Sequence, residues 1–371
     1  MGHARWSGEP KGLLSTSRRV HNPLSQWEYR EGTLKTPSDA ISISRRLVLP
    51  VIATAFLKTG VGQAKLPSVS NDQRSLDAQF DHAIDAPNSQ QVLGRWSTNS
   101  DEVRARLGEP LRMAYGSAPS QRLDIYKTAN TPAPIQIFIH GGEWRRGSAR
   151  ASAYAAESFV QAGAHFIAVD FISADAAGGN LDALLAQLKE AVVWIYRHAP
   201  DFGGDNSRIH IAGHSSGAHL SALLLQTDWL AEFGIPADVL KSGICCSGLY
   251  DLESVSRSDR SQYVYFTPDV VARLSPARQA NRIHCPLILA YASLDSAEFQ
   301  RQTVNFAALC KAAGGNVQTL RCEGYNHFEA IETLANPFGA LGRAALKLIG
   351  VDKPPPVPGT PPTCARSGAV G

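Results

Sequence analysis

Long hydrophobic runs are missing from this 371-residue chain. A helix that crosses a bilayer needs about 20 apolar residues, whereas the apolar stretch at residues 47–57 has eleven. None of the six cysteines has zinc-ligand spacing. A glycine-rich phosphate loop, a pair of catalytic carboxylates, a metal-binding cluster and an internal repeat are also absent. The sequence therefore predicts no stable membrane span, no metal and no cofactor.

Charge is scarce as well, at 19% of residues against 44% hydrophobic residues, which is typical of a soluble globular enzyme. The net charge is +3, but its distribution matters more. Residues 1–64 carry nine Lys and Arg against four Asp and Glu, a net charge of +5, so the remainder carries −2. This balance argues against a nucleic-acid partner or an anionic membrane surface for the folded part.

The cysteines are not spaced for disulfides in the predicted sheet. Cys245 and Cys246 are neighbours on a predicted strand, so they point to opposite faces and are interpreted as buried small hydrophobes. Cys285 and Cys322 fall at opposite ends of neighbouring predicted strands, roughly 20 Å apart by strand rise. That separation is too long for a disulfide bond.

Both ends of the chain differ in composition from its middle. In residues 1–64, Arg45 and Arg46 precede the apolar run, and Ala64 ends a small-x-small sequence, a pattern typical of an export leader of the twin-arginine type. We therefore expect export to a periplasm or secretion, or a cytoplasmic protein if the leader is not processed. The alternative is an amphipathic helix that docks on the domain. Residues 351–371 are rich in Pro and Gly and are predicted to be a disordered tail.

The middle, residues 65–350, is predicted to be one catalytic domain. Residues 66–110 look helical and polar and are expected to cap a sheet. The predicted strands are 111–115, 122–126, 135–139, 165–171, 208–211, 243–247, 287–291 and 317–321, the first two forming a hairpin. The predicted helices include 181–195, 218–225, 298–313 and 335–348. This alternation predicts an α/β fold whose sheet is mostly parallel, with helices on both faces.

Ser215 lies in the middle of a Gly-x-Ser-x-Gly sequence, between a predicted strand and a predicted helix. A serine on such a strand-to-helix turn is held in a strained conformation with its hydroxyl clear of the sheet. Side chains at Gly213 and Gly217 would collide with the neighbouring strand and helix. We therefore predict Ser215 to be a nucleophile. The alternative is a small-residue turn that packs the helix on the strand.

A nucleophilic serine needs a base and a carboxylate that orients the base, in the chain order Ser, Asp or Glu, then His. His327 follows the last predicted strand and is the candidate base. Asp295 follows the preceding strand and is the candidate orienting acid. Two alternatives stay open for the acid, although each has a simpler structural role. Glu298 lies in the first turn of a predicted helix, where an acidic residue stabilises the helix dipole. Asp251 lies in a turn that its side chain could cap.

The oxyanion formed during such a reaction needs at least two amides aimed at one point. Our candidates are the amides of Gly141 or Gly142, in a loop that follows a strand, and that of Ser216. His214 and His219 are too close to the serine in sequence to serve as its base, and we interpret them as packing residues. The side chains expected to line the substrate pocket are those of His140, Trp144, Phe171 and Tyr250.

Several stretches together resemble the kynurenine formamidases and related bacterial esterases of the α/β-hydrolase superfamily, over residues 75–350. The residues that carry the resemblance are 115–116, 121–126, 140–144, 212–220, 247–252, 294–302 and 326–328. The more specific parts are His-Gly-Gly-x-Trp at 140–144 and Asp-Ser-x-Glu-Phe at 295–299. The resemblance implies an α/β-hydrolase fold with Ser215, Asp295 and His327 as its triad.

The expected activity is hydrolysis of small or aromatic carboxylic esters through an acyl-enzyme, without a cofactor. Residues 170–174, around Phe171, lack the Tyr-Arg-Leu-type stretch common in these relatives. An export leader also fits poorly with the cytosolic breakdown of tryptophan. The second hypothesis is therefore an arylformamidase, which would cleave an amide of the N-formylkynurenine type. A third is a ligand-binding hydrolase fold without catalysis, against which the complete Ser, Asp and His set argues.

Overall fold

The computed structural model describes residues 72–352 of the chain. The predicted leader at 1–64 and the predicted tail, from residue 353 onwards, lie outside the described residues. Between residues 72 and 352, no helix is both long enough and apolar enough to cross a membrane.

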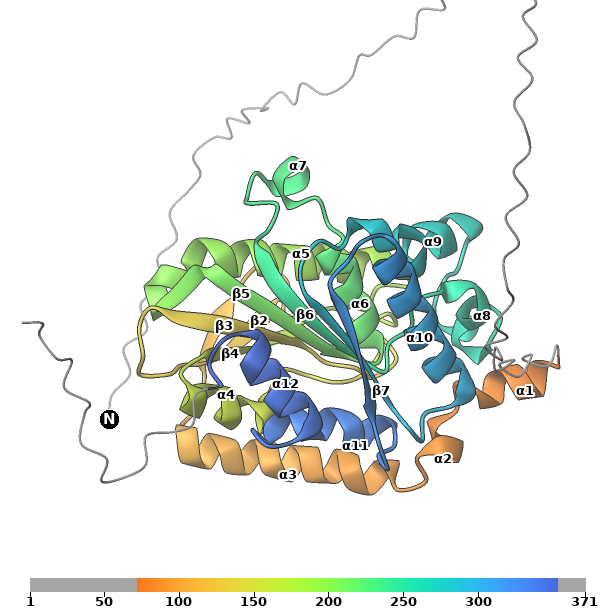
Figure 1. Ribbon diagram of the computed structural model, residues 1–371, viewed down its shortest axis with the longest axis horizontal. Coiled ribbons are helices and arrows are strands. Elements are labelled where there is room, and N and C mark those ends of the chain that lie inside the picture. The colour runs from red at the N-terminus through yellow and green to blue at the C-terminus, as the bar shows by residue number, and fades with distance from the viewer. Residues whose placement is uncertain (1–71, 353–371) are drawn as a thin grey trace, which may run out of the picture. The chain divides into compact units, whose positions relative to one another are not determined.

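An eight-stranded sheet forms the centre of the described region (Figure 1). Its strands are β1 (Leu111–Ala114), β2 (Arg122–Tyr126), β3 (Ala133–Ile139), β4 (His165–Asp170), β5 (Gly204–His214), β6 (Leu240–Cys246), β7 (Leu287–Ala292) and β8 (Val317–Cys322), in the order β1-β2-β4-β3-β5-β6-β7-β8. Strands β3 to β8 are parallel to one another. β1 and β2 form the predicted antiparallel hairpin at one edge, and β2 is also antiparallel to β4. The α/β fold predicted from the sequence is confirmed.

Helices cover both faces of this sheet (Figure 1). They are α1 (Gln73–Ala78), α2 (His82–Asp85), α3 (Ser89–Leu107), α4 (Ala156–Ala162), α5 (Leu181–His198), α6 (Ser216–Leu225), α7 (Trp229–Phe233), α8 (Leu252–Ser256), α9 (Pro268–Arg273), α10 (Ala297–Ala312), α11 (His327–Glu332) and α12 (Ala340–Leu348). Short 3₁₀ turns occur at η1 (Arg150–Ala155), η2 (Ala199–Phe202), η3 (Asp259–Gln262), η4 (Pro276–Arg282) and η5 (Thr333–Ala335).

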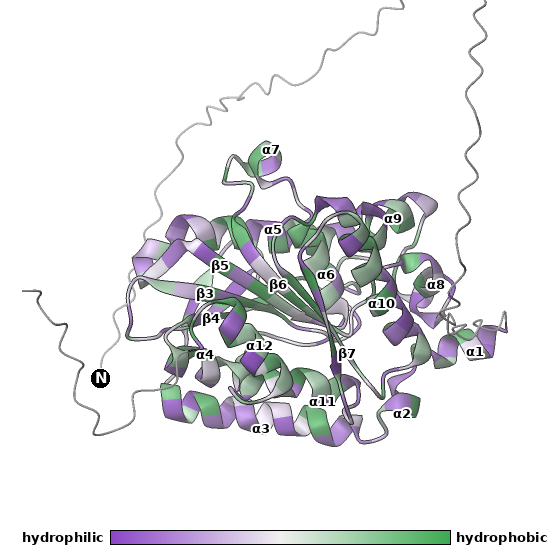
Figure 2. Ribbon diagram, viewed as in Figure 1, coloured by the Kyte–Doolittle hydropathy of each residue, from purple (hydrophilic) through white to green (hydrophobic). Residues whose placement is uncertain are grey.

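Two hydrophobic cores result, one on each face, and Figure 2 shows hydrophobic residues concentrated on the central strands. One core packs α5, α6 and α10 against the sheet, and the other packs α3, α4, α11 and α12 against it. Cys245 belongs to the first core and Cys246 to the second, as the alternation of a strand predicts. The cysteines of the described region, including Cys285 and Cys322, are all free thiols.

β5 and the last helix differ most from their predicted ranges. β5 is longer than residues 208–211 because its pairing with β3 continues past them at both ends. The last helix begins at Ala340 rather than at 335, because Asn336 precedes a proline and adopts an extended conformation. The described part of the cap at 66–110 is helical, as predicted, with α1, α2 and α3 in succession.

Candidate active site

Ser215 occupies the sharp turn between β5 and α6, with φ of 53° and ψ of −124°. This is a costly conformation for a residue other than glycine, and such strain persists only where neighbouring structure holds it. A Cβ atom on Gly213 would strike Gly217 and Ser221, and one on Gly217 would strike the carbonyls of Ile139 and His140. The two glycines of the motif therefore allow α6 to approach the sheet closely enough to make the turn.

The backbone of this turn is fixed, while the Ser215 hydroxyl makes no hydrogen bond to the described residues. The Ser215 amide donates to the Cys246 carbonyl at 2.9 Å, which ties the turn to β6. The Ser215 side chain has no hydrogen-bond partner among the described residues, although it is only 5% exposed. An unpartnered hydroxyl at a helix N-terminus matches the position that a nucleophile needs.

Asp295 and His327 meet beyond the carboxyl ends of β7 and β8. Nδ1 of His327 donates to Oδ1 of Asp295 at 2.7 Å, and both side chains are buried. This bond puts the ring proton on Nδ1 and leaves Nε2 with its lone pair. Nε2 of His327 is buried and has no partner within the described region. The pair therefore has the form of an oriented base whose reactive nitrogen is available.

A capping network fixes His327 at the first position of α11. The side chain of Asn326 accepts the amides of Phe328 and Glu329, and Glu329 bonds back to the Asn326 amide, which is a complete capping box. Asn88, just before α3, bonds to both Asn326 and Glu329. Helix α11 was not among the predicted elements, yet Asn followed three residues later by Glu is the sequence signal that would have found it.

Ser247 also belongs to this site, although no pattern in the sequence predicted it. Its hydroxyl donates to Oδ2 of Asp295 at 2.6 Å, and the Ala292 amide donates to the same oxygen at 2.8 Å. Ser247 follows β6 directly and has a positive φ of 50°, a sign of strain beside a functional group. With His327 on the other oxygen, both oxygens of the Asp295 carboxylate are held in place.

The two other candidate acids lie away from His327 in different roles. Glu298 is bonded by Arg301, Ser254 and Gln302. Burial by itself would raise the pKa of Glu298, but these hydrogen bonds together outweigh it and lower the pKa. Asp251 caps α8 by accepting the Glu253 amide. Neither carboxylate hydrogen-bonds to His327, so only Asp295 has the geometry of an orienting acid.

The loop after β3 lies against the serine turn. An ideal Cβ atom on Gly141 would come within 3.1 Å of the Ser215 Cβ atom, so only glycine fits comfortably there. The Trp144 amide donates to the Ser216 hydroxyl at 3.0 Å, which joins this loop to the start of α6. The amides of Gly141 and Gly142 donate no hydrogen bond to the described residues. They remain available to an oxyanion beside Ser215.

Of the four residues predicted to line the substrate pocket, three do not line the cavity beside Ser215 and His327, which is described below. Trp144 has a positive φ of 61°, and its indole is buried, where the ring N–H donates to His219. Tyr250 is buried and stacks on Phe306, with ring centres 4.5 Å apart. Phe171 stacks on His140, which does line the pocket, and so supports it from behind. Sequence spacing placed these aromatic residues near the site but could not decide which way each ring points.

The two histidines beside the serine turn differ in their roles. His219 is a packing residue, as interpreted: Nε2 donates to the Leu274 carbonyl, Nδ1 accepts from Trp144, and burial lowers its pKa to about 4. The prediction that His214 is only a packing residue is corrected, because His214 also lines the pocket. Its Nε2 donates to the His327 carbonyl at 2.9 Å, and burial and the charge of His327 lower its pKa.

A cavity of about 500 Å³ opens above Ser215 and His327. Its lining comes from the cap, the loop after β3, η1, the serine turn and α11, and comprises Asp81, His82, Ala83, Ser89, Gln90, Leu93, Trp96, Phe138, His140, Gly141, Gly142, Glu143, Arg146, Gly147, Ser148, Ala151, Ser152, Tyr154, His214, Ser215, His327 and Phe328. Apart from His140, the aromatic surface is therefore supplied by rings other than those predicted, above all Trp96, Tyr154 and Phe328. We call this cavity the carboxyl-edge pocket.

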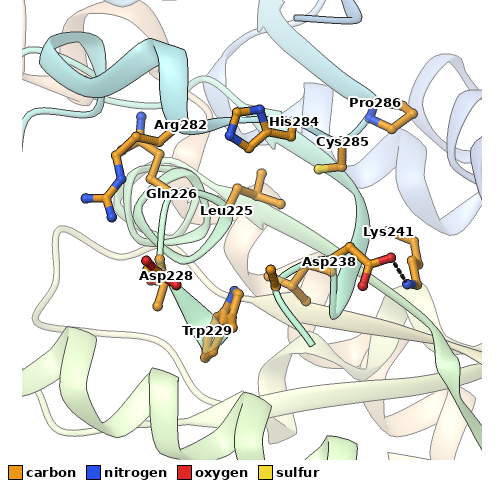
Figure 3. Close-up of a pocket in the computed structure, with 13 residues that line it drawn as sticks. Leu225, Gln226, Asp228, Trp229, Asp238, Lys241, Arg282, His284, Cys285 and Pro286 are labelled. Atoms are coloured by element: carbon orange, nitrogen blue, oxygen red, sulfur yellow. Dashed lines mark hydrogen bonds and ion pairs between the residues drawn. The ribbon is translucent and has the colours of Figure 1, made fainter. Parts of the chain in front are cut away.

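A second cavity, of about 520 Å³, lies at the other edge of the sheet, near the starts of β6 and β7 (Figure 3). We call it the amino-edge pocket. Lys241 in its wall is paired with Asp238 at 2.6 Å, and burial raises the pKa of the Cys285 thiol to about 11. An oriented base and an activated nucleophile are thus both missing from its lining. Ligands of open α/β sheets bind at the carboxyl ends of strands, which favours the carboxyl-edge pocket.

Comparison with known proteins shows which family the chain belongs to. A family model named BD-FAE matches residues 123–234. The kynurenine formamidase of Danio rerio is 30% identical over 260 residues, which cover 68% of this chain and 86% of that protein. The chain belongs to the kynurenine formamidase and esterase branch of the α/β-hydrolase superfamily. Another relative in this branch, the esterase LipC of Mycobacterium tuberculosis, is 29% identical over 58% of this chain and 59% of its own length.

Solved structures agree on the fold. The esterase LipW from Mycobacterium marinum matches with a TM-score of 0.56 at 17% identity, covering 76% of this chain and 91% of that one. An esterase from Pyrobaculum calidifontis matches with a TM-score of 0.54 at 18% identity, covering 71% and 92%. Membership of the branch establishes hydrolase activity, and the likeness in structure establishes the α/β-hydrolase fold.

Proposed function

We propose that this hydrolase cleaves carboxylic esters that carry a short acyl group and a small or aromatic leaving group. The observation that carries the proposal is the oriented His327, whose free Nε2 lies in the same cavity as the unpartnered Ser215 hydroxyl. The cavity volume of about 500 Å³ suits a small molecule. Trp96, Tyr154 and Phe328 give this cavity aromatic surface, which favours a flat aryl group by stacking.

In the proposed reaction, Nε2 of His327 removes the Ser215 proton as the oxygen attacks the carbonyl carbon. The negative charge that develops on the carbonyl oxygen is met by the amides of Ser216 and of Gly141 or Gly142. The His327 imidazolium, oriented by Asp295, then gives its proton to the departing oxygen. Water, activated by the same histidine, attacks the acyl-serine and releases the acid, which restores the free enzyme.

The second candidate is hydrolysis of an arylformamide. It is favoured by the similarity to kynurenine formamidases from Danio rerio and Salmo salar, at 30% and 29% identity. An ester is ranked first because its alkoxide or phenoxide leaves with little help, whereas the amine of an amide must receive a proton in the transition state. Both candidates use the same three side chains and differ in how tightly the leaving atom must be held against His327.

The experiment that separates the two compares kcat/KM on phenyl acetate, a series of p-nitrophenyl esters and N-formylkynurenine. We expect phenyl acetate to be preferred, with activity falling as the acyl chain grows. A preference of about 100-fold for N-formylkynurenine would make the formamidase the function. Activity that rises beyond about eight acyl carbons would contradict the small-pocket argument.

Export, predicted from residues 1–64, also remains a proposal. Mass spectrometry of protein recovered from the native host tests it directly. We expect a mature N-terminus near Lys65. Recovery of the intact leader on active cytosolic protein would contradict export and strengthen the formamidase alternative.

A further inference from the structure

His82 of the short helix α2 lies face to face with His327. The two ring centres are 3.9 Å apart and the ring planes differ by 24°. The other rings around His327 approach it differently: Phe299 and Phe328 edge-on, at 4.8 and 5.2 Å, and His214 at a tilt of 50°. Among the described residues, His82 alone therefore offers a stacked face to the candidate base.

The chain fixes α2 in this position through the same loop that carries Asp295. The Ser296 hydroxyl donates to the Gln79 carbonyl at 2.6 Å, and the Glu298 amide donates to the Gln79 side chain at 3.1 Å. Asp81 then caps α2 by accepting the Ala83 amide. The segment that holds His82 is thus tied to the loop that holds Asp295. The same packing therefore fixes both the ring stack of His82 on His327 and the hydrogen bond between His327 and Asp295.

Neither ring nitrogen of His82 has a hydrogen-bond partner in the described region, although both are buried. Buried polar atoms are usually paired, so an unpaired ring beside a reaction centre calls for a role. Burial lowers the pKa of His82 far below its usual value, and the charges of His327, Arg260 and His214 lower it further. The ring is consequently neutral when the enzyme works.

The charged groups around His82 come from several elements. Arg260, on η3, adds positive charge, whereas His214, at the end of β5, is itself buried with a lowered pKa that favours its neutral form. Asp85, on α2 itself, has its pKa raised to about 6, mainly by burial and then by the charge of Asp295. A neutral ring is therefore the form of His82 that adds no repulsion when His327 becomes positive.

We propose that His82 is a positioning residue for the general base: its neutral ring fixes the plane of the His327 imidazole and stabilises the imidazolium that forms during proton transfer. A cation over a neutral aromatic face is attracted to it, and this attraction exists only once His327 has taken the proton. A base whose ring is free to tilt loses rate because small misplacements are costly in a near-attack geometry. The proposal rests on the proposed serine hydrolase function.

The test compares His82→Ala, His82→Phe and the control Ile84→Ala on one small ester. Ile84 lies on the same helix and is 61% exposed, so its truncation is expected to leave activity unchanged. His82→Ala is expected to lower kcat about 30-fold while KM changes less than threefold, because only a transition-state contact is lost. His82→Phe keeps an aromatic face and is expected to restore kcat to within about threefold of the original enzyme.

Two outcomes would overturn the proposal: His82→Ala with unchanged kcat, or His82→Phe as impaired as His82→Ala. Thermal unfolding of each variant separates a lost fold from lost positioning, and His82→Phe keeps the packing volume if the alanine variant is unstable. Ser215→Ala in the same assay isolates the underlying function. If Ser215→Ala still turns over, the serine mechanism fails, whatever His82 does. If only Ser215→Ala is inactive, the mechanism stands and the role of His82 fails.

Discussion

The carboxyl-edge and amino-edge pockets have nearly the same volume, about 500 and 520 Å³, yet they differ in what their walls contain. Around the first, four buried polar atoms have no partner within residues 72–352: both nitrogens of His82, Nε2 of His327 and Nε1 of Trp96. In the lining of the second, Gln226 alone contributes such an atom among the described residues, and its amide nitrogen is already bonded to two carbonyls. These atoms lie on helices α2, α3 and α11, and their unsatisfied polarity, rather than cavity size, distinguishes the candidate active site.

The largest effect is expected when one hydroxyl is removed from each pocket and the two variants are compared. Ser215→Ala is expected to lower kcat on p-nitrophenyl acetate 10⁴-fold or more, because the acyl-enzyme cannot form. Thr227→Ala, in the amino-edge pocket, is expected to change kcat less than twofold, since its hydroxyl only bonds the Leu223 carbonyl. Ester hydrolysis at the original rate by Ser215→Ala would place the chemistry elsewhere.

The orienting acid is tested by changing a single charge. Asp295→Asn is expected to lower kcat about 10³-fold or more, because an amide no longer fixes the His327 tautomer. Asp251→Asn, which alters an exposed helix cap, is the matched control and is expected to retain nearly full activity. Circular dichroism of both variants checks that the fold survives. A silent Asp295→Asn would hand the role to another carboxylate.

Ser247 provides a sharper test of how the acid is held. Ser247→Ala removes one of the two donors to Oδ2 of Asp295 and leaves the Ala292 amide in place. We expect kcat to fall about 10-fold, since one hydrogen bond to a charged group is worth about 1.5 kcal/mol. Ser247→Thr keeps a hydroxyl and should recover part of the loss. Equal activity in all three proteins would show that Asp295 needs no support from β6.

Stability against pH tests whether helix α2, beside the carboxyl-edge pocket, carries an electrostatic cost. The folded protein raises the pKa of Asp85 to about 6 from 3.8, mainly through burial. The folded state thus binds this proton more tightly, so the stabilisation is complete below about pH 4 and is lost as pH rises towards 6. Asp85→Asn should raise Tm by about 1–3 °C at pH 8, a small effect because the carboxyl is only partly buried. At pH 4 the two proteins should unfold together, and an equal rise at both pH values would contradict this account.

The smallest expected effect belongs to the amino-edge pocket. His284→Ala removes the histidine of its lining and is expected to leave kcat/KM within twofold of the original value. The matched change, His327→Ala, should abolish turnover. Both proteins are assayed on the same ester series. A large loss in His284→Ala would mean that the contrast between the pockets is wrong.

Local patterns in the sequence are enough to predict the fold class, the element order and the residues of the candidate triad. Apolar strands alternating with helices allow little besides a parallel sheet, and the carboxyl ends of parallel strands must share one edge. Glycines on both sides of Ser215 mark a turn that larger residues would block. Chain order then leaves few acids and bases that can reach that edge, which is why local pattern found Asp295 and His327.

The packing of the whole described region determines which side chains face the carboxyl-edge pocket and which support the candidate triad. Trp144 and Tyr250 looked like pocket walls, but ring direction depends on backbone twist and on partners distant in sequence, here His219 and Phe306. Ser247 contacts Asp295, and His82 contacts His327, across large separations in the sequence. A local sequence pattern cannot predict contacts of this kind. Periodicity specifies which face of an element is buried, whereas contacts between elements are fixed only when the whole sheet and its helices pack together.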